Sequence, residues 1–180
     1  MAARPILRMG TPSLFEKSSP WPADKFDSAE LHALLTDMKD SMVAASGAGL
    51  AAPQIGENVR VVIFEVSNNS RYPGRLPIPF TVLINPELML SAEEMVSDWE
   101  GCLSVPGMRG IVPRALSLRY TGFDEFGNAI DRAVTGFHAR VVQHEVDHLD
   151  GVLYPMRMTD MTKFGYTAVM FPELLGIDED

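Results

Sequence analysis

The sequence predicts an α+β protein with mostly antiparallel sheet. Two segments, one near the N-terminus and one around residue 144, carry apolar residues at the spacing of amphipathic helices. Between them lie several short runs of β-branched and apolar residues, bounded by glycine, proline and polar turn residues, as is typical of strands. Because the strands cluster between two helices and do not alternate with them, a parallel α/β sheet is not expected.

The first helix is predicted over residues 28–46. Asp27 or Ser28 can serve as its N-cap, and Gly47 follows its end. The apolar positions that define its buried face are Leu31, Leu34, Leu35, Met38, Met42 and Val43. The preceding residues 10–26 are rich in glycine and proline, which favours an extended arm or loop.

The remaining elements follow from local composition. A glycine-rich loop is expected at 47–54 and a polar, proline-rich loop at 67–79. Strands are expected at 59–66, at 81–85 with a stop at Pro86, at 88–90, from 95 to 100, and in a hairpin of 116–120 and 129–134. The second helix starts at Thr135 or Gly136 and ends near Gly151. The last twenty residues show only a weak pattern of apolar spacing, and they end in a run of acidic residues.

Composition excludes several classes of protein. The net charge is −9, which opposes a surface that tracks nucleic-acid phosphates, so no direct nucleic-acid binding is expected. No apolar run approaches the ~18 residues of a membrane helix. The N-terminus lacks the apolar stretch of a signal peptide. A single cysteine, Cys102, rules out an intramolecular disulfide and favours a reducing compartment.

The segment with the clearest chemistry is His-Glu-x-x-His at residues 144–148. On a helix, His144 and His148 share one face and can present two imidazoles to one metal ion. Glu145 projects beside them, where a carboxylate can take a proton from a water that the metal activates. The motif therefore predicts a metal-dependent hydrolase.

A catalytic metal usually has three protein ligands, so two histidines are not enough. His32, on the first helix, and His138, on the wrong face of the second, are both expected to be structural. Cys102 remains, in a turn-like segment at the end of a strand. Its spacing leaves two interpretations open, a small buried apolar residue or a third ligand.

Three segments together resemble the signature motifs of the peptide deformylase family, in the family's order. They are residues 47–54 (GAGLAAPQ), 100–104 (EGCLS) and 143–151 (QHEVDHLDG). The likeness runs from about Ile6 to about Leu153, and residues 104–110 are most like the subgroup found in organelles and some bacteria. The resemblance implies antiparallel sheets packed around a central helix that carries the His-Glu-x-x-His motif.

The resemblance also implies an activity and a set of catalytic residues. The activity is removal of the N-formyl group from the initiator formyl-methionine of newly made polypeptides. Cys102, His144 and His148 would bind one divalent metal ion per chain, with Fe²⁺ favoured in the cell and Zn²⁺, Ni²⁺ or Co²⁺ as alternatives. Glu145 would be the general acid and base. The side chain of Gln54 and the backbone N–H of Leu103 would stabilise the oxyanion.

Five residues are expected to contact the substrate. Gly49 would let the peptide lie against the backbone as an added strand. An apolar pocket for the methionine side chain is expected at Ala48, Phe137 and Val141. Arg109 resembles a family arginine near the substrate backbone. Glu100 is expected to support the metal ligands without binding the metal itself.

The chain is predicted to be a single metallohydrolase domain over residues 1–180, with a catalytic core of about 5–158 and an acidic tail of 159–180. The expected partners are N-formyl-methionyl nascent peptides. The tail offers no long basic helix with which to dock on the ribosome. The expected location is the bacterial cytoplasm, or an organelle if a transit peptide has been removed.

Two alternatives stay open at this stage. A zinc metallopeptidase of the His-Glu-x-x-His class would need a further ligand downstream, and Glu173 is the only glutamate after His148 outside the terminal acidic run. A non-enzymatic structural metal site would need four protein ligands, of which the fourth is missing.

Overall fold

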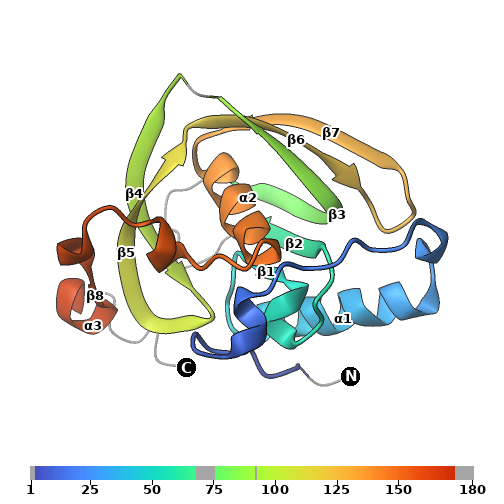
Figure 1. The fold of residues 1–180 in the computed structure, drawn as a ribbon, viewed down its shortest axis with the longest axis horizontal. Helices are drawn as coiled ribbons and strands as arrows, with labels where there is room; N and C mark the ends of the chain where they lie inside the picture. Colours follow the sequence, from blue (N-terminus) through green and yellow to red (C-terminus); the bar gives the residue numbers. More distant parts are fainter. Residues whose placement is uncertain (1–2, 68–75, 92, 173–180) are drawn as a thin grey trace.

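The computed structural model describes residues 3–67, 76–91 and 93–172. It contains two antiparallel sheets with the helix α2 (Gly136–Leu149) between them (Figure 1). The larger sheet has the order β1-β2-β3-β6-β7, and the smaller has the order β4-β5-β8. The bounds are Gly49–Ala51 for β1, Val61–Val66 for β2, Ile78–Leu90 for β3, Met95–Cys102 for β4, Val105–Ala115 for β5, Ser117–Phe123 for β6, Ala129–Thr135 for β7 and Phe164–Tyr166 for β8. The predicted combination of few helices with antiparallel sheet is confirmed.

Helix α1 spans Ala29–Ala44 and packs against β1 and β2. The Ser28 side chain accepts a hydrogen bond from the backbone N–H of Leu31, which satisfies one of the free donors at the start of the helix. The apolar face is buried at five of the six expected positions, Leu31, Leu34, Leu35, Met38 and Met42. The sixth, Val43, is 63% exposed and does not belong to that face.

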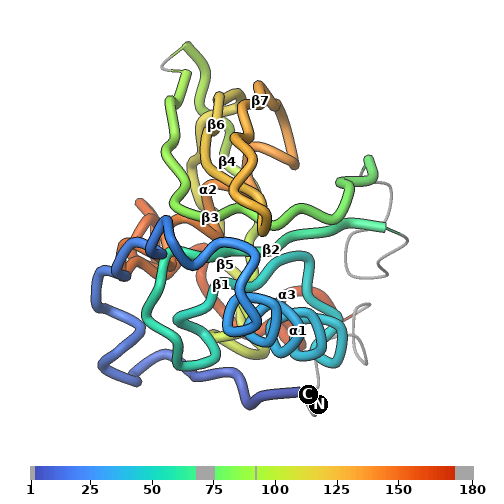
Figure 2. Tube along the Cα trace, turned by 90° about the vertical axis from the view of Figure 1, so that its right-hand side faces the viewer, coloured from blue at the N-terminus to red at the C-terminus, as the bar shows by residue number. Residues whose placement is uncertain are grey.

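Helix α2 packs its apolar face on the larger sheet. Ala139, Val142, Val146 and Leu149 belong to one core with strand residues such as Phe64. Polar side chains on the opposite face bond the smaller sheet: Asp147 accepts from Arg114 of β5, and Arg140 donates to Glu100 of β4. Figure 2 shows β6 and β7 of the larger sheet side by side, at the opposite end of the molecule from α1. A helix that is buried on both sides holds its polar residues in place, because the backbone cannot rotate without losing the core contacts.

Gln143 connects the helix to the end of strand β5. Its side-chain amide accepts a hydrogen bond from the backbone N–H of Ala115 at 3.1 Å and donates one to the Ala115 carbonyl at 2.9 Å. The side chain thus bonds both backbone groups of the residue at which the chain leaves the smaller sheet for the larger one.

Strand β3 does not stop at Pro86, as the sequence suggested. It continues to Leu90 and merges the two expected strands, with a break in register between Ile84 and Glu87. Pro86 lies in that break, where the ladder does not need its missing N–H. Asn85 adopts a positive φ of 51° there, and its side chain bonds both backbone groups of Trp21.

Three strands were not predicted from the sequence. Strand β1 lies within the glycine-rich loop, β5 contains two prolines and two glycines, and β8 lies in the weakly patterned tail. Each is defined by its partner: β1 pairs with β2, while β5 pairs with β4 and β8.

Of the expected loop at 67–79, residues 68–75 lie outside the described residues, as do residues 173–180 of the tail. None of the helices in the described ranges is long and apolar enough to cross a membrane.

Candidate metal centre

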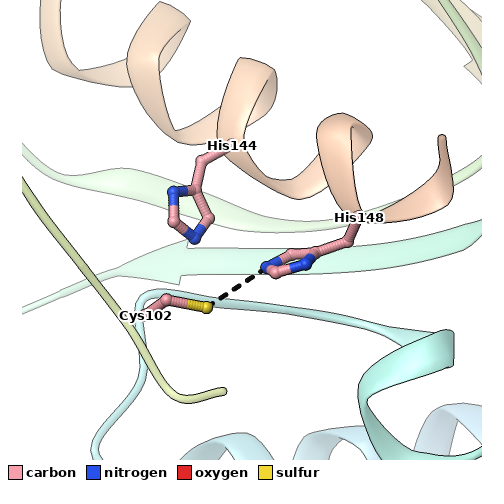
Figure 3. Close-up of side chains that lie close together, drawn as sticks. All are labelled: Cys102, His144 and His148. Carbon is pink, nitrogen blue, oxygen red and sulfur yellow. Dashed lines mark hydrogen bonds between the residues drawn. The ribbon is translucent and has the colours of Figure 1, made fainter. Parts of the chain in front are cut away.

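Three potential metal ligands meet between the sheets. Cys102 is the last residue of β4, while His144 and His148 lie one turn apart on α2 and point toward it (Figure 3). The ligand atoms of the three residues all lie within 4.8 Å of one another. Cys102 Sγ lies 3.4 Å from His148 Nε2. The structure thus brings together the three residues that the family resemblance implied.

The electrostatics of this cluster fit a bound cation. The pKa of His144 is raised well above its ordinary value: burial opposes the charge, but the Cys102 and Glu100 side chains more than offset that effect. The pKa of His148 is lowered, because burial and the nearby His144 both disfavour a second charge. One positive charge is therefore favoured between Cys102 and Glu100. A sulfur and two imidazoles are also a donor set that suits zinc and ferrous iron.

Glu100 holds His144 in orientation. It is buried, and its Oε2 lies 2.8 Å from His144 Nδ1. With Nδ1 engaged in this way, the Nε2 atom of His144 is left to face a metal. Burial raises the pKa of Glu100, but hydrogen bonds from His144 and Arg114 outweigh it, so the pKa lies well below its ordinary range. The expected supporting role of Glu100 agrees with this contact.

Two buried arginines neutralise Glu100. Arg114 donates from Nε to Oε1 at 2.9 Å and from Nη2 to Oε2 at 3.0 Å. Arg140 donates to Oε1 at 2.7 Å and to the carbonyls of Val96 and Val112. Arg114 also bonds Asp147, which is paired with Arg157. Sequence reasoning missed both arginines. Arg140 lies one helical turn before His144, which was the only available signal.

Replacing Glu100 with Gln tests this network. The change removes the charge, which leaves buried Arg140 without a counter-ion and Arg114 with Asp147 alone. Breaking comparable buried pairs costs about 3–5 kcal/mol. We expect urea unfolding of the metal-free protein to show a loss of that size in the free energy of unfolding. The matched control, Glu57→Gln, breaks an exposed ion pair with Arg4 and should cost about 0–1 kcal/mol. Equal effects of the two changes would contradict the role of the network.

The same contacts make the stability of the folded protein depend on pH. The folded protein holds the pKa of Glu100 below its ordinary value of 4.5. The stabilisation is therefore fully present above pH 4.5 and is lost as the pH falls below it. In Glu100→Gln this acid-dependent part of the stability should be absent.

Glu145 lies beside the ligands and bonds to none of them. It is 5% exposed, and its Oε2 atom has no hydrogen-bond partner among the described residues. Burial raises its pKa to about 7, with Glu100 adding to the effect and the nearby His144 and Arg114 opposing it. A buried carboxyl group with a pKa near neutrality can accept and release a proton at physiological pH.

Gln54 and Leu103 line the same pocket as Cys102 and Glu145. The Oε1 atom of Gln54 accepts from the backbone N–H of Ala51 at 2.8 Å, and its Nε2 donates to Ser104 Oγ at 3.1 Å. That Nε2 atom lies 3.7 Å from Cys102 Sγ. The amide is therefore fixed from both ends and faces the cluster. Ser104, which holds it, was not predicted from the sequence.

These residues line a pocket with an empty volume of about 570 Å³. The expected substrate residues Ala48, Gly49, Phe137 and Val141 all belong to its wall. Arg109 does not line this pocket in the described part of the chain; it lies on β5, opposite Gly101. Trp99 and Arg140 also line the wall, and sequence reasoning gave neither of them a place there.

The two other histidines lie away from the cluster. His32 is partly exposed and bonds the Asp27 side chain at 2.8 Å. His138 packs its ring against Phe64 and Tyr120. Glu173, the ligand that a metallopeptidase would need, lies outside the described residues. In the ranges that are described, the group around His144 and His148 is completed by Cys102.

Comparison with known proteins gives a consistent result. A family model described as polypeptide deformylase matches residues 3–164. Peptide deformylase 1 of Nitrosomonas europaea is 59% identical over 169 residues, covering 94% of this chain and 95% of the relative. Peptide deformylase 2 of Ralstonia nicotianae is 57% identical over 171 residues, covering 95% of this chain and 96% of that relative.

Solved structures are similar over most of the chain. A class I type b peptide deformylase from Acinetobacter baumannii, bound to Met-Ala-Ser, has a TM-score of 0.84 at 36% identity and covers 87% of this chain and 99% of that one. The same protein bound to actinonin has a TM-score of 0.78 at 34% identity, covering 88% of this chain and 100% of that one.

Proposed function

Because this chain belongs to the polypeptide deformylase family, we propose that its pocket removes the N-formyl group from the formyl-methionine of newly made polypeptides. One observation carries the assignment. Cys102, His144 and His148 converge, and Cys102 and His144 line a pocket with Glu145 and Gln54. This is an arrangement for hydrolysing an amide, since it offers a metal site, a proton acceptor and an oxyanion donor together.

Cys102, His144 and His148 would hold one divalent ion. When bound, the metal supplies a Lewis acid that lowers the pKa of water and polarises a carbonyl oxygen. We place Fe²⁺ first for the cell, on the family resemblance, with Zn²⁺, Ni²⁺ and Co²⁺ as ions that the same ligands accept. Three protein ligands leave a coordination position open, as catalytic sites require, which argues against a closed structural site.

The protein side chains would then move one proton and stabilise one charge. Glu145 accepts a proton from the water that attacks the formyl carbon. The Nε2–H of Gln54 and the backbone N–H of Leu103 donate to the formyl oxygen as it becomes negative. Glu145 passes its proton to the methionine nitrogen as the C–N bond breaks, which releases formate and a free amine.

The substrate peptide would lie along β1. This strand is at the edge of the larger sheet, paired on one side only with β2 among the described strands. An extended peptide can add to such an edge, and Gly49 offers backbone without a side chain there. The methionine side chain would enter the pocket and contact the part of its wall formed by Ala48, Phe137 and Val141. Arg109 would contact the peptide backbone beyond the pocket.

We further propose that residues 1–180 act as one domain in the bacterial cytoplasm, where nascent chains begin with formyl-methionine. The bacterial relatives support this location. Measuring formate release from formyl-Met-Ala-Ser tests the function directly. Release of formate with a free N-terminal methionine is expected. Cleavage between the amino acids, with no formate, would instead identify a metallopeptidase.

Replacing Gln54 with Leu tests the oxyanion role. The change keeps a similar volume and removes one donor, so we expect kcat to fall by about 10²–10³-fold with little change in KM. Steady-state kinetics of formate release measures both constants. Metal content should match the unchanged protein, since Gln54 is not among the ligands. A loss confined to KM would mean that Gln54 only binds the substrate.

A further inference from the structure

The backbone of β1 at Gly49 runs so close to the Glu145 side chain that no side chain at position 49 would fit between them. A Cβ atom built on Gly49 would lie 2.3 Å from Glu145 Oε1, 2.5 Å from its Cδ and 2.8 Å from its Cγ. All three distances are shorter than van der Waals contact. Alanine at this position would therefore overlap the whole outer half of the Glu145 side chain, and not only its tip.

Of the two partners in this contact, the strand is the one that cannot move. Gly49 is paired with Phe64, and the next two residues of β1 are paired with Ile63 and Val62. Leu50, which follows Gly49, is fully buried. The carbonyl of Ala48 accepts from the backbone N–H of Glu65. Displacing the strand would break these bonds and open the core.

Glu145 is held more weakly. Its Oε2 atom is buried without a hydrogen-bond partner in the described ranges. The carboxylate is therefore placed by what it packs against, and the surface it packs against is the bare backbone of Gly49. An added methyl group would push the carboxylate away from its position beside His144.

We infer that Gly49 is a positioning residue for Glu145: the missing side chain creates the space in which the proton-transferring carboxylate sits. This inference rests on the proposed function and adds to it, because it gives Gly49 a second task besides contact with the substrate backbone. The two tasks are separable by experiment. A substrate contact depends on the peptide, whereas the space for Glu145 depends on the Glu145 side chain.

The test is a double-mutant cycle with Gly49→Ala, Glu145→Ala and the double variant. Gly49→Ala should lower kcat for formyl-Met-Ala-Ser by about 10²-fold or more, within the usual range for loss of a general acid or base. Metal content should stay within twofold. Any change in the affinity for the product Met-Ala-Ser reports the substrate contact, and it should be the same with and without Glu145. In the Glu145→Ala background, adding Gly49→Ala should change kcat less than twofold, because the carboxylate is already gone.

Stability gives a second readout that does not depend on turnover. Gly49→Ala should lower the midpoint of thermal unfolding when Glu145 is present and leave it unchanged in Glu145→Ala. If Gly49→Ala alone folds poorly, the double variant should fold. Gly165→Ala is the matched control: it adds a methyl to another short strand, where it meets only the flexible end of Met170. Its kcat should stay within twofold of the unchanged protein.

Several results would overturn the inference. Normal turnover by Gly49→Ala is one, and an equal loss of kcat or stability from Gly49→Ala with and without Glu145 is another. If instead the unchanged protein releases no formate, the proposed function fails. The stability cycle still decides in that case whether Gly49 makes room for Glu145.

Discussion

Glu145→Gln should lower kcat for formate release by at least about 10²–10⁴-fold, the range for losing a general acid or base. Glutamine keeps the shape of the side chain and one hydrogen bond, but it cannot carry the proton from the attacking water to the leaving amine. The variant should fold, bind the same amount of metal and still bind Met-Ala-Ser. Elemental analysis and formate release over a range of pH measure these properties.

The pH profile adds a second check. Activity requires Glu145 to be deprotonated, so it should fall as the pH drops through the pKa of that carboxyl. Burial sets that pKa at about 7 in the protein alone, and a cation bound at His144 would lower it. This acidic limb should be missing from the residual activity of Glu145→Gln. The control Glu30→Gln, on the exposed face of α1, should keep both the kcat and the acidic limb of the pH profile.

Lost metal in Glu145→Gln would make Glu145 a ligand. Full metal content with near-normal turnover would show that proton transfer does not need this side chain.

Removing the metal should abolish formate release altogether. A chelator should reduce activity to background, and adding Fe²⁺, Ni²⁺, Co²⁺ or Zn²⁺ should restore it to different extents. With Fe²⁺ the restored activity should fade in air, because a thiolate ligand and a ferrous ion are both open to oxidation. Nickel should resist this loss. Full activity in the chelated protein would exclude a metal role.

Cys102→Ala separates the enzyme classes under the same conditions. A deformylase that loses one of three ligands should bind metal at a greatly reduced level and should not be rescued by added ions. A metallopeptidase whose third ligand lies elsewhere would keep its metal. Ser28→Ala is a suitable control, since it changes the N-cap of α1, which does not line the pocket, and it should leave metal content unchanged.

The sequence predicted the parts of this fold that carry a local pattern. Both long helices follow from apolar spacing and their flanking residues, and the ligands on α2 follow from a four-residue repeat on one face. Strand β5 shows what such reasoning misses. Its prolines and glycines carry no strand pattern, and its structure depends on pairing with β4, which is a long-range contact.

The residues of the candidate metal centre were likewise predictable from the sequence only in part. His144 and His148 are close in sequence, but Cys102 is 46 residues before His148, and spacing alone left its role open. The resemblance to a family supplied that link. Arg114 and Arg140 could not have been found by either route, because an arginine in a sequence is ordinarily a surface residue. Their role appears only when Glu100 is seen buried between them.

The bond between Gln143 and Ala115 has a mechanical consequence. The pocket lies between two sheets, and the chain passes from one to the other immediately after Ala115. By bonding both backbone groups of Ala115, Gln143 ties the helix that carries His144 and His148 to the sheet that carries Cys102. Gln143 therefore helps to fix the width of the cleft, together with Arg140 and Asp147, which also bond the smaller sheet. The cleft can widen only if these hydrogen bonds break, including the two that Gln143, the residue next to His144, makes with Ala115.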